Sequence, residues 1–330
     1  MNPYFGVDGW SFLVVFFCRL AAMLKGQVGL NELASDEVQL FVLFLIAISC
    51  ALVGAFLVLK KMTMLANSLS HTILPGLVVA YLLCSLFSGQ MEFSISSMSI
   101  QTLVLASLVT ALMTTFSTQL FSHLFKLQED ASIGLVCTTM VAIGVVLVTV
   151  FTRSTHLGVE AVMGNVDALH AHDVKGVFWI ALVNSVVIFL FFKELKLISF
   201  DPGFGTTQGF SEKSWGYLIM LLTSMTVVGA FRAVGILLVL SFLVGPVLTA
   251  RLFTHRLKVL ILFSMGIGIG ASFLSVLLSR HFLSVYQVPL STAGIVSTLI
   301  GFIYFFSLAV KFTLQKLEKA GKLRAISTEG

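Results

Sequence analysis

The chain contains a succession of apolar runs, each close to twenty residues long and separated by short polar or basic stretches. A helix needs about 20 apolar residues to cross the ~30 Å hydrocarbon core of a bilayer, and helices satisfy their backbone hydrogen bonds internally. Membrane spans are predicted at residues 40–59, 63–85, 98–120, 131–152, 174–192, 214–231, 233–250, 259–279 and 292–311. The predicted fold is therefore all-α, a polytopic integral membrane helical bundle of about nine transmembrane helices.

The two ends of the chain differ from this pattern. Residues 9–24 are apolar but short and include Arg19, which indicates an interfacial helix or an incomplete span. Residues 26–38 are expected to form a polar linker. The predicted organisation is an N-terminal segment at 1–39, a transmembrane domain at 40–311 and a basic, helical cytoplasmic tail at 312–330.

Composition and charge exclude other broad classes. The sequence is 58% hydrophobic and only 11% charged, which is typical of a polytopic membrane protein and not of a soluble domain. Although the net charge is +5, the basic residues fall at helix ends, so the charge indicates topology and not nucleic-acid binding. The predicted spans divide the 20 Lys and Arg residues 14 to 6, which favours a cytoplasmic C-terminus.

A polar stripe occurs in the second predicted span, where Asn67 and His71 lie four residues apart and share one helical face. Counting from Lys60 and Lys61 at the expected membrane surface, His71 lies about 16 Å deep, near the bilayer midplane. Pro75 then leaves the carbonyl of His71 without its helical bond. A transient cation site and a buried histidine bonded to a neighbouring helix are both compatible with this pattern.

Glycine and proline also suggest where helices are interrupted or packed closely. Pro75–Gly76 and Gly245–Pro246 are predicted helix breaks, which in transporters often line the pathway. Gly266-x-x-x-Gly270 has the spacing of a close helix–helix contact.

Two polar loops carry further candidate residues. The predicted external loop 153–173 contains groups that suit first-row metals, although a solvated loop has the same composition: His156, Glu160, Asp167, His170 and His172. The loop SFDPGFGTTQGFSEK at 199–213 is small and Gly-rich, and Asp201 followed by Pro202 suits a helix start. The sequence contains no G-x-x-x-x-G-K-[ST] motif, so ATP hydrolysis would need a separate chain.

These motifs together resemble the transmembrane subunits of bacterial manganese, zinc and iron ABC importers. The matching stretches are the basic pair, His71 with Leu74-Pro75-Gly76, EDASIG (129–134), VMGN (162–165), SFDPGFGTTQG (199–209) and VGILLVLSFLVGPVLTAR (234–251). The resemblance implies a multi-pass permease subunit in the bacterial cytoplasmic (inner) membrane, with a divalent metal ion as substrate and no permanently bound cofactor. It also implies three partners: an ABC ATPase, an extracytoplasmic metal-binding protein and a second permease subunit.

In this family an acidic residue stands where this chain has Asn67, followed four residues later by the histidine. The resemblance makes Asn67 and His71 the metal pathway. The external loop is a candidate for metal entry on its residue types alone, beside its reading as a solvated loop. It assigns ATPase coupling to the segment that contains Asp201, Pro202, Gly203, Phe204, Gly205 and Gly209. Because Asn67 is uncharged, either a softer, His-rich site or a second, different permease that supplies the carboxylate is expected; the second is favoured.

Two alternative functions also account for part of this pattern. A stand-alone secondary metal transporter or channel would also use a midplane histidine and broken helices. An intramembrane hydrolase is more distant, because the sequence contains neither H-E-x-x-H nor G-x-S-x-G and no acidic residue accompanies Ser68, Ser70 and His71. Dependence on an ATPase and a metal-binding protein separates the importer from both alternatives.

Overall fold

The computed structural model describes most of the chain from residue 128 onward, two long earlier stretches and scattered residues between 68 and 126. The described residues are 9–25, 34–64, 68, 75–76, 78–79, 109–110, 113–114, 116–118, 120–122, 124–126, 128–152, 166–169 and 171–328. Asn67, His71, His156, Glu160 and His170 lie outside them.

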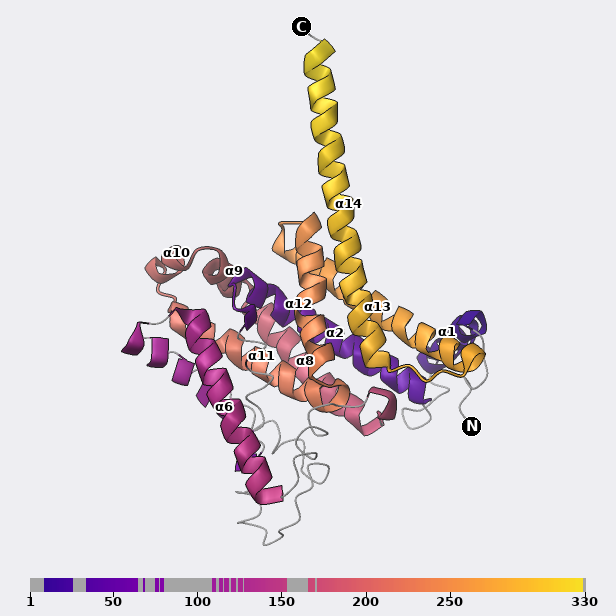
Figure 1. Cartoon of the computed structure of the whole chain (residues 1–330), viewed down its shortest axis with the longest axis horizontal. Helices are drawn as coiled ribbons and strands as arrows, with labels where there is room; N and C mark the ends of the chain where they lie inside the picture. The colour runs from indigo at the N-terminus through magenta and orange to yellow at the C-terminus, as the bar shows by residue number, and fades with distance from the viewer. Residues whose placement is uncertain are drawn as a thin grey trace.

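All regular elements in this part of the chain are helices (Figure 1). They are α1 (Gly9–Leu24), α2 (Ser35–Leu59), α6 (Glu129–Thr152), the short 3-10 helix η3 (Val166–Ala168), α8 (Ala171–Leu190), α9 (Phe192–Phe200), α10 (Pro202–Thr207), α11 (Glu212–Val234), α12 (Ile236–Phe253), α13 (Leu257–Tyr286) and α14 (Thr292–Thr328). The all-α prediction is confirmed.

Helix α2 runs through the middle of the bundle and packs against α8, α11, α12 and α13 (Figure 1). A side chain at Gly54 would meet the backbone carbonyl of Leu243 in α12, because a Cβ there would lie 2.1 Å from that oxygen. Glycine is therefore required for this close approach of α2 and α12. Large apolar side chains such as Leu43 and Phe56 fill the remaining core around α2.

The close contact expected at Gly266 and Gly270 is not formed with any residue in the described part of the chain. There, neither glycine has an atom within 4 Å of a Cβ built on it, whereas Gly268 faces Ala47 of α2, with 3.0 Å between the built Cβ and the Ala47 Cβ. All three glycines lie in α13, and successive residues on a helix point about 100° apart. The rotation of α13 against α2 therefore selects the intervening glycine.

The predicted break at Gly245–Pro246 is also not observed, because α12 continues through both residues. Pro246 lacks an N–H and so removes only one helical hydrogen bond. The Thr249 hydroxyl donates to the Gly245 carbonyl at 2.9 Å. Gly245 lies against α14, where a Cβ would come 2.2 Å from Ile300 Cγ2. The glycine thus serves helix packing, and the proline is accommodated inside a continuous helix.

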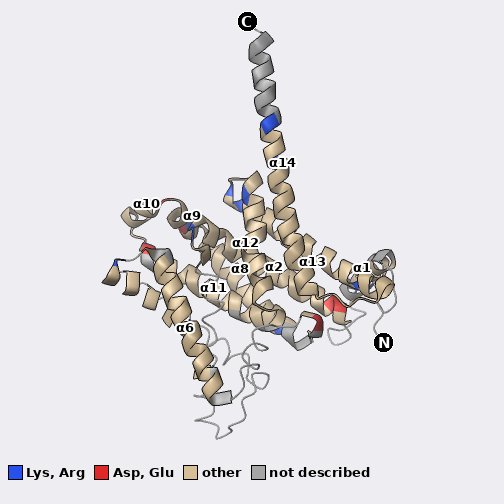
Figure 2. Cartoon of the chain, viewed as in Figure 1, with Lys and Arg blue, Asp and Glu red and all other residues tan. Residues whose placement is uncertain are grey.

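Among the described residues, five helices are long and apolar enough to cross a membrane, or six if the bent pair α8–α9 counts as one span. The bend between α8 and α9 is 72°. The predicted spans 63–85 and 98–120 lie mostly outside the described part, so the number nine stays a prediction. In the described part, most charged residues lie near helix ends or in connections, whereas α14 carries Lys311 and Lys316 along its length (Figure 2). The chain is a multi-pass membrane protein.

Helix α14 extends well beyond the bundle toward the C-terminus (Figure 1). It runs without a break across residue 311, the boundary predicted between the transmembrane domain and the basic tail. The predicted tail is therefore a direct continuation of the last helix.

Helix α1 occupies the predicted range and packs on α13. With 16 residues it is shorter than the roughly 20 that a span needs. The expected linker at 26–38 is too long at its C-terminal end, because α2 already begins at Ser35. The difference arises because Glu37 caps the helix, accepting a hydrogen bond from the Ala34 N–H at 2.9 Å.

Candidate functional site

One described residue beside the predicted metal pathway, Ser68, lies against α6. Ser68, which directly follows Asn67 in sequence, is buried, and its carbonyl lies 3.9 Å from the Cys137 Sγ of α6. Among the residues that the structure describes, the Ser68 hydroxyl has no hydrogen-bond partner. Cys137 was not singled out from the sequence, because an isolated cysteine in an apolar span is usually a packing residue.

The two helix-break residues of this segment are both described as helical. Pro75 is buried. A Cβ on Gly76 would lie 1.6 Å from Thr110 Oγ1, so glycine lets the backbone lie directly on this threonine. The Thr114 hydroxyl donates to the Thr110 carbonyl at 2.8 Å, so this hydroxyl finds its partner one helical turn away. Gly76 is therefore required for close packing at this level.

A second polar group lies inside the bundle, between α2, α8 and α11. Asn184 is fully buried, and its Nδ2 donates to Ser49 Oγ and to Thr226 Oγ1, both at 2.6 Å. The Thr226 hydroxyl in turn donates to the Leu222 carbonyl at 2.7 Å. Buried polar groups in lipid-exposed bundles hold helices together through such bonds. An asparagine within an apolar span was the sequence signal for this node.

Buried ion pairs fasten one end of the bundle. Arg280 of α13 binds Asp36 through its Nε at 2.6 Å, and Arg19 of α1 binds Glu37 through its Nε at 2.5 Å. Both carboxylates belong to the first turn of α2, where the positive end of the helix dipole also stabilises their negative charges. The two ion pairs therefore lie at the same end of the bundle, and both Arg19 and Arg280 belong to the side that the predicted topology makes external.

The external candidate residues are only partly described. Asp167 in η3 accepts hydrogen bonds on its Oδ1 from Gln39 Nε2 at 2.8 Å and from Thr292 Oγ1 at 2.6 Å. It thereby joins α2 to the start of α14. His172 lies in the first turn of α8, but its side chain is outside the described part. Within the described residues, no group of three or more His, Cys, Asp or Glu side chains could hold a metal ion.

The opposite end of the bundle carries the predicted coupling segment. Asp201 caps α10, its Oδ1 accepting from the Phe204 N–H at 3.0 Å, and Pro202 occupies the first turn, as expected from the sequence. Gly205 is buried against α9, where a Cβ would lie 3.2 Å from Ile198 Cγ1. Gly209 has a φ of +86°, which favours glycine.

The outward surface of this segment is apolar in part. The side chain of Phe204 is 51% exposed, and Gly203 is exposed beside it. Behind the segment, α2 ends at Leu59 and is followed by Lys60. Burial lowers the pKa of the Lys60 ammonium, and the nearby charge of Glu212 offsets part of this shift. Lys60 and the predicted coupling segment therefore lie at the same end of the bundle.

Comparisons with known proteins agree with this arrangement. Residues 38–311 match the ABC 3 transport family. The chain is 39% identical over 312 residues to a probable metal transport system membrane protein of Chlamydia muridarum, covering 94% of this chain and 95% of that protein. It is 35% identical over 237 residues to the manganese transport system membrane protein MntD of Bacillus subtilis, covering 68% of this chain and 76% of that protein.

The fold is shared with a solved structure. PsaBC from Streptococcus pneumoniae, in complex with Fab, contains a chain that aligns with a TM-score of 0.68 at 23% identity, covering 87% of this chain and 95% of that chain. The family match spans all predicted spans, and the chlamydial relative matches nearly the whole length. The chain belongs to the ABC 3 transport family, as a membrane permease of the metal-transport type.

Proposed function

We propose that this chain is the permease subunit of an ATP-driven importer of a divalent transition metal ion, Mn, Zn or Fe. The observation that carries the proposal is a family match across 38–311 in a bundle whose coupling segment is an independently capped helix. The names of relatives support a metal substrate, since they include manganese proteins and a zinc transport system membrane protein of Treponema pallidum. Uptake by vesicles that contain the complete complex, compared with vesicles lacking one partner, tests it.

The proposed mechanism is alternating access. A metal-binding protein delivers the ion at the end that carries the ion pairs of α2, and the external loop with Asp167 receives it. The ion then pauses at the level of Asn67 and His71. ATP binding by a separate ATPase moves α10 and thereby the end of the bundle where Lys60 leads into the pathway segment.

The ATPase is proposed to bind the exposed side of α10, with Phe204 as the main apolar contact. A partly exposed aromatic side chain on a short projecting helix is the kind of anchor that protein interfaces use. Gly205 acts on the other side of this helix, because it allows α10 to lie on Ile198 of α9. Force on α10 would therefore pass directly to α9 and to the bend at the end of α8.

Replacing Gly205 by Leu is expected to uncouple ATP hydrolysis from transport. Overpacking at this contact costs about 1–3 kcal/mol, which is enough to shift the six-residue helix α10 away from α9. The ATPase rate of the assembled complex should remain while metal uptake falls severely. The matched control is Gly216→Leu, since no described residue has an atom within 4 Å of a Cβ at Gly216. Full uptake by Gly205→Leu would show that this contact does not transmit the motion.

The second permease subunit is proposed to be a different, related chain. A dication in a low-dielectric pathway needs compensating charge, because an uncompensated buried ion is very costly. Two copies of this chain would offer Asn67 and His71 twice but no carboxylate from those positions. A partner with an acidic residue in place of Asn67 would supply one.

Asn67→Asp is expected to be tolerated in such a heterodimer, while loss of the partner's carboxylate should stop transport. Purification by a tag on this chain should recover a second permease in equal amount. A fully active complex with this chain as its single permease species would rule out the heterodimer and leave the softer, His-rich site.

A further inference from the structure

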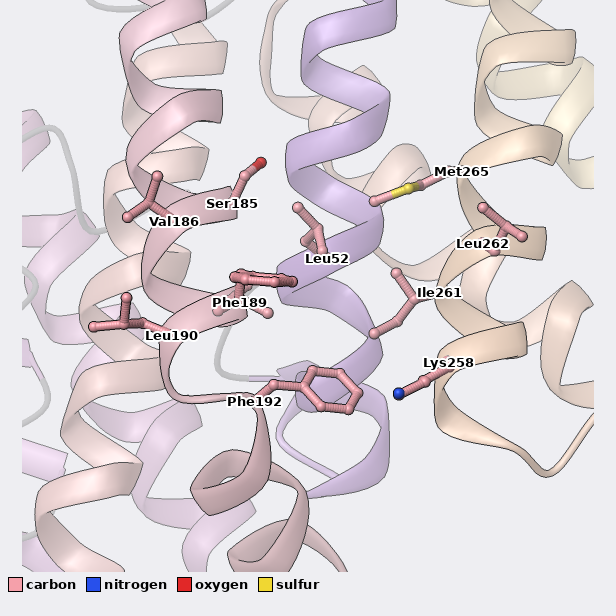
Figure 3. Close-up of a pocket in the computed structure, with 11 residues that line it drawn as sticks. Leu52, Ser185, Val186, Phe189, Leu190, Phe192, Lys258, Ile261, Leu262 and Met265 are labelled. Atoms are coloured by element: carbon pink, nitrogen blue, oxygen red, sulfur yellow. The ribbon is translucent and has the colours of Figure 1, made fainter.

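An apolar groove of about 810 Å³ lies between α2, the α8–α9 bend and α13 (Figure 3). Phe189 and Phe192 line it on the two sides of the bend, and Leu262 and Met265 line it from α13. The side chains of Phe189 and Leu262 are 84% and 72% exposed, so the groove opens toward the surroundings of the bundle. In a multi-pass membrane protein this surface faces the bilayer or another membrane chain.

The groove has a single cationic end. Of the described residues that line it, Lys258 is the one that is charged, and its Nζ lies 5.9 Å from the centre of the Phe192 ring (Figure 3). The hydroxyl of Ser185, also in the lining, already donates to the Ala181 carbonyl at 2.7 Å. Lys258 is therefore the lining group available to an external anion.

The charged end of the groove is placed at a membrane surface. Lys258 belongs to the first turn of α13 and follows Arg256 in the short connection from α12. From Lys258 to Met265 the groove follows α13 for about 10 Å, roughly a third of the hydrocarbon core. An occupant with one anionic end and an apolar body that points toward the bilayer centre would match both features.

The chemistry of the lining favours a lipid over a second helix. Helices in membranes associate closely through small residues such as Gly, Ala and Ser. The walls of the groove are instead formed by large side chains, such as Phe189 and Met265, that leave a gap between them. A flexible acyl chain can fill such a gap, and a phosphate group can bind the Lys258 ammonium. Anionic lipids are also concentrated at surfaces rich in Lys and Arg.

We propose that an anionic phospholipid of the inner leaflet binds in this groove, with its phosphate on Lys258 and an acyl chain against Phe189, Leu262 and Met265. Because this acyl chain would contact both Phe189 and Phe192, the lipid would stabilise the 72° bend that leads to α9 and α10. The lipid would thus be a structural partner of the coupling segment. Its binding is measured independently of transport.

Native mass spectrometry of the full-length protein, titrated with phosphatidylglycerol or phosphatidylcholine, tests the proposal. Lys258→Ala is expected to lower retained phosphatidylglycerol roughly fivefold, the factor equivalent to the ~1 kcal/mol that one lysine contributes near an anionic surface. Lys316→Ala is the matched control, because Lys316 also has its Nζ near an aromatic ring, 5.3 Å from the centre of the Phe312 ring in α14, but does not line the groove. This variant should retain the lipid like the unmodified protein.

Met265→Trp keeps the charge but fills the groove, and it should also reduce phosphatidylglycerol retention. Equal retention of both lipids, or equal losses in Lys258→Ala and Lys316→Ala, would overturn the proposal. Retention unchanged in Met265→Trp would contradict it as well. A Leu262→Cys protein that crosslinks to a second permease in the assembled complex would show that protein, not lipid, covers the groove.

Discussion

His71→Ala protein is expected to insert and assemble normally but to transport no metal ion. The imidazole is predicted about halfway across the bilayer, where a polar side chain is costly and usually functional. If His71 is a transient ligand, its loss removes the one nitrogen donor at that level of the pathway segment. Uptake of radioactive metal by cells or vesicles measures the effect directly.

The matched control for this prediction is His255→Ala. His255 is exposed in the connection between α12 and α13 and should be dispensable for transport. Both variants should reach the membrane in equal amounts and purify with the ATPase. Normal uptake by a well-expressed His71→Ala protein would show that His71 is a packing residue bonded to a neighbouring helix.

Asp36→Ala is expected to lower the free energy of unfolding by about 3 kcal/mol, because it leaves the Arg280 guanidinium without its partner. The side chain of Asp36 is only 3% exposed and that of Arg280 is 20% exposed, so water can compensate only part of the loss. The pair fastens α13 to the first turn of α2, which packs at the centre of the bundle. Thermal unfolding of the purified protein in detergent, followed by circular dichroism, measures the change.

A double-mutant cycle separates the pair from its surroundings. Removal of Asp36 and Arg280 together should cost less than the sum of the two single replacements, since neither charge is then left alone. Arg256→Ala, at an exposed position, should change stability by no more than about 0.5 kcal/mol. Unaltered unfolding of Asp36→Ala would mean that this ion pair contributes nothing to the attachment of α13.

The helices of this protein could be predicted from sequence because a membrane span is a local property of length and apolarity. The start of α10 was equally local, since Asp201 and Pro202 act on the next residues of the chain. Both features depend on neighbours in sequence and so survive without knowledge of the tertiary structure.

The contacts between helices could not be predicted in the same way. Whether Gly266 or Gly268 meets α2 depends on the rotation of α13, which the spacing of glycines leaves open. The pairing of Asp36 with Arg280 joins residues 244 positions apart in sequence. Gly205 was assigned to the ATPase surface, yet it lies on the inner side of α10 against Ile198. A role of Gly205 in coupling, as proposed above, would therefore act through α9.

The most direct test of the proposed function is metal uptake by sealed vesicles that contain this permease, its companion permease and the ATPase. The metal-binding protein is supplied at the external face of the permeases. The account predicts uptake of Mn, Zn or Fe that requires ATP and stops when the ATPase or the metal-binding protein is omitted. Metal uptake by vesicles containing this chain alone, driven by an ion gradient without ATP, would contradict the account and identify a stand-alone transporter or channel.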